Sequence, residues 1–134
     1  MKPTETVILV AEDEPVVRNL IGLMLSKEGY AVLTGNDGQE ALEVCEKFKH
    51  PIHLLLTDVE MPRMNGLALA ERVREQRPEI KIVMMSGTTR MTILTENTPD
   101  AFLSKPFIPP TLLQCLKKVL ESSFRGLCHE NDVL

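Results

Sequence analysis

The chain has 134 residues, of which 43% are hydrophobic, 25% charged and 4% aromatic, proportions typical of one soluble globular domain. A chain of this length can bury a sizeable core without disulfides or metals, but it is too short for two full domains. The formal net charge of −4 argues against a general binder of nucleic acids or anionic membranes, and it suits a cation or a basic partner surface.

The N-terminus and the cysteines indicate a cytoplasmic protein. Residues 1–6 lead directly into a short apolar run without a signal-peptide pattern, and the sequence has no run of 18 apolar residues. Cys45, Cys115 and Cys128 are odd in number and widely spaced, so we expect buried or free thiols and neither a disulfide framework nor a zinc site. We therefore predict a cytoplasmic location without membrane insertion.

Short apolar runs predict the strands of a sheet. Runs of this length are typical of strands buried on both faces of a parallel sheet, and the weakest run, 30–34, suits an edge. In chain order, the predicted strands are 7–11, 30–34, 52–56, 80–85 and 101–104.

Helical periodicity fills the gaps between these runs. Pro15 and Gly29 suit the start and stop of the first helix, and Asp37 with Glu40 resembles a capping box for the second. The threonine-rich segment 88–98 predicts only a short or irregular helix. The expected helices are 15–28, 37–48, 66–76, 88–98 and 109–120. Regular alternation of strands and helices predicts an α/β fold, a parallel sheet covered by helices on both faces.

Charged and polar residues follow the predicted strands at their carboxyl ends, where open α/β sheets collect their chemistry. Glu12 and Asp13 follow the first strand, Asp58 the third, Ser86 the fourth and Lys105 the fifth. Carboxylates gathered at one edge would repel each other without a cation, and a hard divalent ion such as Mg²⁺ resolves that repulsion.

A phosphoryl group would complete this arrangement. Asp58 could accept it, Lys105 and the metal could neutralise its oxygens, and the Ser86 hydroxyl could donate a hydrogen bond to one of them. The sequence thus predicts phosphoryl chemistry that depends mainly on positioning and charge.

These motifs resemble the receiver domain of two-component response regulators, and the likeness extends over residues 7–122. It rests on VAEDEP after the first strand, LLLTDVEMPRMNG across the third, MMSG at the fourth and FLSKPF at the fifth. The resemblance implies a flavodoxin-like fold of three αβα layers, with five parallel strands in the order 2-1-3-4-5. It also implies a chemotaxis-type receiver standing alone over 1–123, with a tail, 124–134, that carries no output domain and is expected to fray.

The resemblance also implies roles for the acidic residues. Asp58 would be the phospho-acceptor and a Mg²⁺ ligand, Asp13 would bind the metal directly, and Glu12 would bind it through water. The backbone carbonyl of Glu60 would complete the protein ligands. The side chains of Glu60 and Thr88 stand at positions that tune phosphoryl lifetime in the family.

Ser86 and Lys105 would hold the phosphoryl group, and the bond from Lys105 to Pro106 would be cis. Phe102 matches the switch aromatic, which turns inward when Ser86 moves onto the phosphoryl group. The function implied is a signalling switch that catalyses only its own phosphorylation and dephosphorylation.

The implied partners are proteins. A histidine kinase or a histidine phosphotransfer protein would donate the phosphoryl group. An effector would bind the face formed by 88–98, 101–104 and 109–120, and no nucleic acid is expected.

Two other functions remain open at this stage. A Mg²⁺-dependent phosphohydrolase resembling haloacid dehalogenases would place its nucleophile after the first strand, on Asp13, so the motif around Asp58 argues against it. A pseudo-receiver that is never phosphorylated would not need the full set of acidic groups, and loss of Mg²⁺ binding would favour it.

Overall fold

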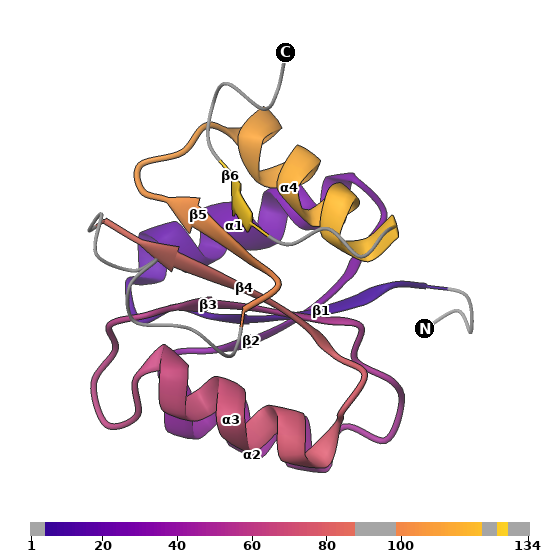
Figure 1. The fold of residues 1–134 in the computed structure, drawn as a ribbon, viewed down its shortest axis with the longest axis vertical. Helices are drawn as coiled ribbons and strands as arrows, with labels where there is room; N and C mark the ends of the chain where they lie inside the picture. The colour runs from indigo at the N-terminus through magenta and orange to yellow at the C-terminus, as the bar shows by residue number, and fades with distance from the viewer. Residues whose placement is uncertain (1–4, 88–98, 122–125, 129–134) are drawn as a thin grey trace.

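The computed structural model describes residues 5–87, 99–121 and 126–128. Its parallel sheet runs in the order β2-β1-β3-β4-β5-β6 (Figure 1). The elements are β1 (Val7–Ala11), α1 (Pro15–Lys27), β2 (Ala31–Gly35), α2 (Gly38–Lys47), β3 (Leu54–Asp58), α3 (Gly66–Gln76), β4 (Lys81–Ser86), β5 (Ala101–Ser104), α4 (Pro109–Glu121) and β6 (Gly126–Cys128). The predicted order of the first five strands is confirmed, and the helix expected over 88–98 lies outside the described residues.

The helices begin where the sequence offers a proline or a capping side chain. Pro15 lies in the first turn of α1, where its missing N–H costs no hydrogen bond. Asp37 accepts a hydrogen bond from the Glu40 N–H at 2.8 Å, and Asn65 accepts one from the Ala68 N–H at 2.8 Å. Each carboxylate or amide oxygen satisfies a backbone donor that the first turn of a helix leaves unpaired.

Two layers of helices cover the sheet. α1 and α4 pack on one face, and α2 and α3 pack on the other (Figure 1). Successive strand residues point to opposite faces, so that Ile8 and Met85 lie in one hydrophobic cluster while Leu9 and Met84 lie in the other. All four side chains are fully buried, which is why the strands read as continuous apolar runs.

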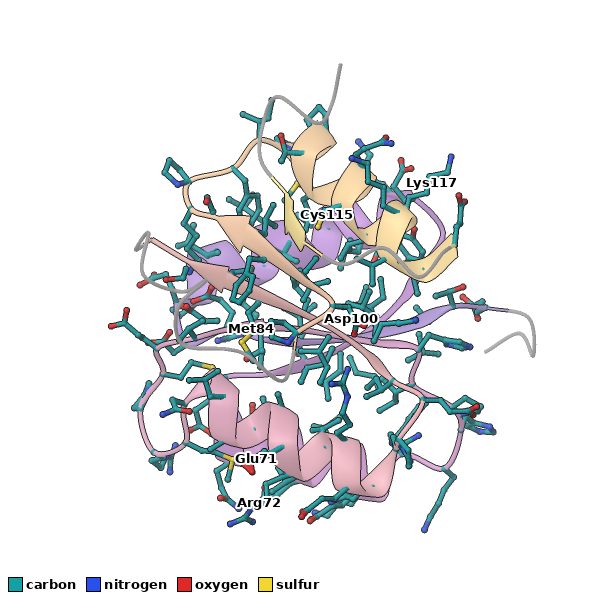
Figure 2. All side chains as sticks on the ribbon, viewed as in Figure 1. Glu71, Arg72, Met84, Asp100, Cys115 and Lys117 are labelled. Atoms are coloured by element: carbon teal, nitrogen blue, oxygen red, sulfur yellow. The ribbon has the colours of Figure 1, made fainter. Side chains whose placement is uncertain are left out.

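Each helix buries the face that lies against the sheet and exposes the opposite face. On α3, the exposed residues Glu71 and Arg72 point away from the sheet, whereas Met84 lies between the sheet and this helix (Figure 2). Lys117 is exposed on α4, while Cys115 of the same helix is buried. Amphipathic burial of this kind stabilises helices too short to persist alone in water.

The start of β5 is fixed by a buried carboxylate. Asp100, 5% exposed, accepts hydrogen bonds from the Ile82 N–H at 2.7 Å and from Arg74 Nη2 at 3.0 Å. Its own N–H donates to the Ile82 carbonyl at 2.7 Å. The strand that leads to Lys105 is therefore held against β4 and α3 by the residue that directly precedes it.

Three expectations are corrected by the structure. Gly29 follows α1 with a φ of +95°, as expected, but Leu20 is 54% exposed, although its spacing from Val17 and Ile21 on the helix face predicts that it packs. Cys45 is a free buried thiol, whereas Cys115 is disulfide-bonded, so the expectation of unpaired thiols is wrong for Cys115. Finally, fraying of the whole tail is wrong, because β6 pairs with β5.

A search of the described residues finds no helix that is both long and apolar enough to cross a bilayer.

Candidate functional site

The predicted site residues gather at the carboxyl edge of the sheet. Glu12 and Asp13 directly follow β1, and Asp58 ends the neighbouring strand β3. Ser86 ends β4 opposite Ser104 of β5, and Lys105 comes next. Parallel pairing thus brings residues more than ninety positions apart to one place, since Glu12 and Lys105 are separated by 93 positions.

Lys105 is the centre of the charge arrangement. Its Nζ donates a hydrogen bond to Glu12 Oε1 at 2.9 Å and another to Asp58 Oδ2 at 2.9 Å. The Glu12 side chain is 1% exposed and that of Asp58 is 12% exposed. The ammonium therefore holds two largely buried carboxylates together, which would otherwise repel each other.

Burial and pairing shift the pKa values of these groups. Burial is the main cause that raises the pKa of the Glu12 carboxyl, and the hydrogen bonds from Lys105 and the Glu14 N–H only partly offset it. Burial lowers the pKa of Lys105, but its hydrogen bonds with Glu12 and Asp58 outweigh burial and raise the pKa above 10.5. Lys105 consequently keeps its positive charge at neutral pH.

Backbone contacts hold the two carboxylates in place. The Glu14 N–H donates to Glu12 Oε2 at 3.1 Å, and Arg18 Nη1 donates to the Glu12 carbonyl at 2.9 Å. The Thr57 hydroxyl donates to the Asp58 carbonyl at 2.9 Å. These bonds satisfy polar groups that burial would otherwise leave costly.

The oxygens present fit a magnesium ion. One carboxylate oxygen each from Glu12, Asp13 and Asp58 lies within 4.8 Å of the other two. Ligands on opposite sides of octahedral Mg²⁺ lie about 4.2 Å apart, so these carboxylates approach the size of a coordination sphere. Asp13 is exposed while the other two are buried, which leaves one side of the group open to water.

The remaining predicted residues are placed as follows. Ser86 is 3% exposed, and its carbonyl accepts a hydrogen bond from the Lys105 N–H at 2.8 Å. Phe102, 8% exposed, packs in the cluster beneath α2 and α3. The Lys105-Pro106 bond is cis, and Glu60 is exposed on the loop after β3. Thr88 lies outside the described residues.

Sequence reasoning missed Arg18, whose guanidinium supports the backbone of the acidic turn. Its position six residues after Glu12 on an amphipathic helix is the signal that could have indicated it, because the first turns of such a helix face back toward the preceding strand end.

The comparisons with known proteins agree on one family. A family model described as the response regulator receiver domain matches residues 8–117. The response regulator receiver protein CpdR of Brucella abortus is 36% identical over 116 residues, which cover 84% of this chain and 95% of CpdR. The sensor kinase CckA of the same organism is 34% identical over 117 residues, 85% of this chain but 12% of the kinase. The chain spans about half or less of several other curated relatives.

A solved structure agrees with the same fold. The response regulator protein TrrA from Thermotoga maritima, in complex with Mg²⁺-BeF, aligns with a TM-score of 0.76 and 32% identity, covering 86% of this chain and 99% of that one. Receiver domains bind Mg²⁺ at an acidic pocket, and phosphorylation-dependent signalling is the general function of this family. Carboxylates, lysine and strand order together with these matches show that the chain belongs to the receiver domain family of two-component response regulators.

Proposed function

We propose that this chain is a signalling switch that accepts a phosphoryl group on Asp58. The observation that carries the proposal is the pairing of Asp58 with Lys105 beside two further carboxylates. A carboxylate oxygen of Asp58 attacks phosphorus, the bond from phosphorus to the donor nitrogen breaks, and an acyl phosphate forms. The donor histidine leaves as a neutral imidazole after taking up a proton.

The other groups of the site act through charge and position. Asp13 and Asp58 would bind Mg²⁺ directly, Glu12 would bind it through water, and the Glu60 carbonyl would add a further oxygen. Bound Mg²⁺ supplies positive charge that neutralises phosphoryl oxygens. Lys105 adds a second positive charge, and the Ser86 hydroxyl donates a hydrogen bond that is made only once the phosphoryl group is present.

The hydrogen bond from the Ser86 hydroxyl to the phosphoryl group would make the site a switch. Phosphorylation adds charge that Ser86 and Lys105 engage best in one arrangement, so it biases an existing equilibrium. We propose that Phe102, two residues before the strand end that leads to Lys105, follows this change by packing. The side chains of Glu60 and Thr88 would tune how long the phosphoryl group survives.

The donor is proposed to dock on an apolar surface next to the site. Val16, Leu20 and Leu23 of α1 are 64%, 54% and 64% exposed, and Ile108 is 46% exposed. We call Val16, Leu20 and Leu23, which recur four and three positions apart along α1, the α1 apolar surface. Large apolar side chains grouped in this way are typical of interaction sites.

A partner helix fits this place. A cavity of about 370 Å³ beside the surface is lined by Met24 of α1, by Phe107 and by Lys105, which also faces the acidic site. A helix seated in the cavity would hold its side chains close to Asp58. We therefore propose a histidine kinase or a histidine phosphotransfer protein as donor, and the similarity to the sensor kinase CckA supports it.

The output is proposed to pass to a separate protein. Residues 1–123 would form the receiver and 124–134 its tail, and an effector would bind the face formed by β5 and α4; segment 88–98 of the predicted effector face lies outside the described residues. We propose the cytoplasm as the location, and no catalysis beyond the chain's own phosphorylation and dephosphorylation.

The central experiment is phosphorylation by acetyl phosphate with Mg²⁺, read by intact mass. We expect a gain of one phosphoryl group in the parent and no gain in Asp58→Asn, because the amide cannot form an acyl phosphate. An equal gain in both proteins would refute Asp58 as acceptor. Labelling lost in Asp13→Asn instead, with turnover of a simple phosphate ester, would favour the phosphohydrolase. Absence of Mg²⁺ binding would favour the pseudo-receiver.

A further inference from the structure

The loop after Asp58 is closed tightly at its base. The Val59 N–H donates to the Met85 carbonyl at 3.0 Å, and the Gly66 N–H donates back to the Val59 carbonyl at 2.8 Å. A Cβ on Gly66 would overlap the Asp58 carbonyl oxygen. The first residue of the loop is thus bonded to β4, the last is bonded back to the first, and Glu60 lies between them.

The far end of the loop holds an unusual turn. Arg63 has a φ of +69°, in a region that residues other than glycine rarely adopt. The Met64 N–H donates to the Pro62 carbonyl at 2.8 Å, so the three residues form a turn with positive φ at its centre, the rarer γ-turn form. Such a backbone persists only when surrounding contacts determine it.

Those contacts come from the N-terminus of α2. Arg63 Nη2 donates to Asp37 Oδ2 in an ion pair with a buried carboxylate, although Arg63 itself is largely exposed. The other oxygen of Asp37 caps α2 through the Glu40 N–H. A Cβ on Gly38 would overlap the Met64 carbonyl oxygen, so the loop backbone rests directly against the helix.

The Asp37 side of this contact is itself rigid. Its hydrogen bond from the Glu40 N–H is the main cause that lowers the pKa of the Asp37 carboxyl, and Arg63 lowers it further. Glu40 also accepts a hydrogen bond from the Asn36 N–H at its Oε1. Asp37 is therefore an ionised and fixed anchor at neutral pH.

We infer that Arg63 is a positioning residue. Its ion pair with Asp37 holds the loop in the conformation that places the Glu60 carbonyl for Mg²⁺ binding. This inference rests on the proposed function, because it assigns the Glu60 carbonyl to Mg²⁺. A positive φ at an arginine costs free energy. The turn adopts it because this conformation allows Arg63 to form its ion pair with Asp37. Arg63 touches neither the phosphoryl group nor the metal, and it acts through the loop.

The test measures Mg²⁺ binding by calorimetry without any phosphodonor. Arg63→Gly keeps the positive φ accessible while removing the guanidinium, and Asp37→Asn keeps an oxygen for the helix cap while removing the charge. Arg63→Lys restores the charge. Arg72→Met is the control, because it removes an exposed guanidinium on α3, away from the loop.

We expect Arg63→Gly and Asp37→Asn each to raise the Mg²⁺ dissociation constant about threefold to fivefold, the range of a partly exposed ion pair. The double variant should bind no more weakly than the weaker single variant, since both remove the same contact. Arg63→Lys should recover most of the affinity, and Arg72→Met should match the parent.

A second readout separates positioning from stability. Arg63→Gly relieves the strained turn, so its urea midpoint should not fall, while amide hydrogen exchange over residues 59–65 should accelerate in metal-free protein. Unchanged Mg²⁺ affinity and unchanged exchange in both single variants would overturn the inference while leaving the proposed function intact. A parent protein that does not bind Mg²⁺ would instead overturn the proposed function and, with it, this role of Arg63.

Discussion

The ammonium group of Lys105 neutralises Glu12 and Asp58, each at 2.9 Å. In the proposed function, the same charge would also engage the phosphoryl oxygens. The ammonium that would bind the phosphoryl group thus also stabilises the folded protein. Substitutions of Lys105 should therefore affect stability as well as signalling.

Replacing Lys105 with methionine should make this visible. Glu12 and Asp58 would face each other without their cation, and we expect the free energy of unfolding at pH 7 to fall by about 1–3 kcal/mol. Mg²⁺ should recover more stability in Lys105→Met than in the parent, because it replaces the lost positive charge. Urea unfolding with and without Mg²⁺ measures both effects.

The pH dependence follows from the direction of the pKa shift. Folding raises the pKa of Lys105 above its ordinary value of 10.5. Its stabilisation is therefore fully present below pH 10.5 and is lost as pH rises through the higher folded-state pKa. Equal stability of parent and Lys105→Met at pH 7 without Mg²⁺ would contradict this account of the ion pairs.

At the scale of elements, the glycines distinguish tight packing from open space. Gly66 begins α3 where a Cβ would overlap the Asp58 carbonyl oxygen, whereas a Cβ on Gly22 of α1 would meet no atom within 4 Å beyond the adjacent residues and backbone of its own helix. The same substitution should therefore have opposite effects in the two helices.

We expect Gly66→Ala to lower the free energy of unfolding by about 1–3 kcal/mol through overpacking. Gly22→Ala should raise it by about 0.5–1 kcal/mol, because alanine restricts the unfolded chain and favours the helix. Urea unfolding measures both. Since Gly66 presses on the backbone of Asp58, Gly66→Ala should also slow labelling by acetyl phosphate, and a normal rate there would contradict this coupling.

The bounds of β3 show how much of an element can be predicted from the sequence. The third strand was predicted at 52–56, but β3 covers Leu54–Asp58. His53 precedes β3 with an exposed side chain whose Nδ1 accepts a hydrogen bond from the Val7 N–H, while polar Thr57 and Asp58 are buried at the strand end. Hydropathy cannot separate these cases, because burial at a strand end depends on neighbouring strands.

The site was more predictable than its supports. Glu12, Asp13, Asp58 and Lys105 each follow a strand, so parallel topology alone brings them together. Arg63 could not be predicted, because its contact with Asp37 depends on a turn with positive φ and on a helix start 26 positions away. Such contacts have no local sequence pattern.

At the scale of the whole molecule, the α1 apolar surface reaches the site through Leu20, which lines the same cavity as Lys105. The α1 apolar surface belongs to the layer formed by α1 and α4, whereas Glu71 lies on the opposite layer (Figure 2). A donor protein must approach Asp58 closely, while a small donor needs no surface. The two kinds of donor therefore test the surface separately.

We expect Leu20→Gln to raise the half-saturating concentration of a histidine phosphotransfer donor about tenfold, the effect of losing one central apolar contact. Its labelling by acetyl phosphate should equal that of the parent. Glu71→Gln serves as control and should change neither rate. A parallel loss with both donors would instead mean that Leu20→Gln damages the acidic site itself.

The sixth strand changes what kind of partner this molecule can recognise. β6 pairs with β5 through residues 126–128, so the hydrogen-bonding groups on the outer side of β5 are already used by the chain itself. An incoming protein cannot extend the sheet at β5 without first displacing β6. Binding at β5 must therefore rely on side chains, because the backbone of β5 is closed to strand addition and to the edge-to-edge aggregation that an open strand invites.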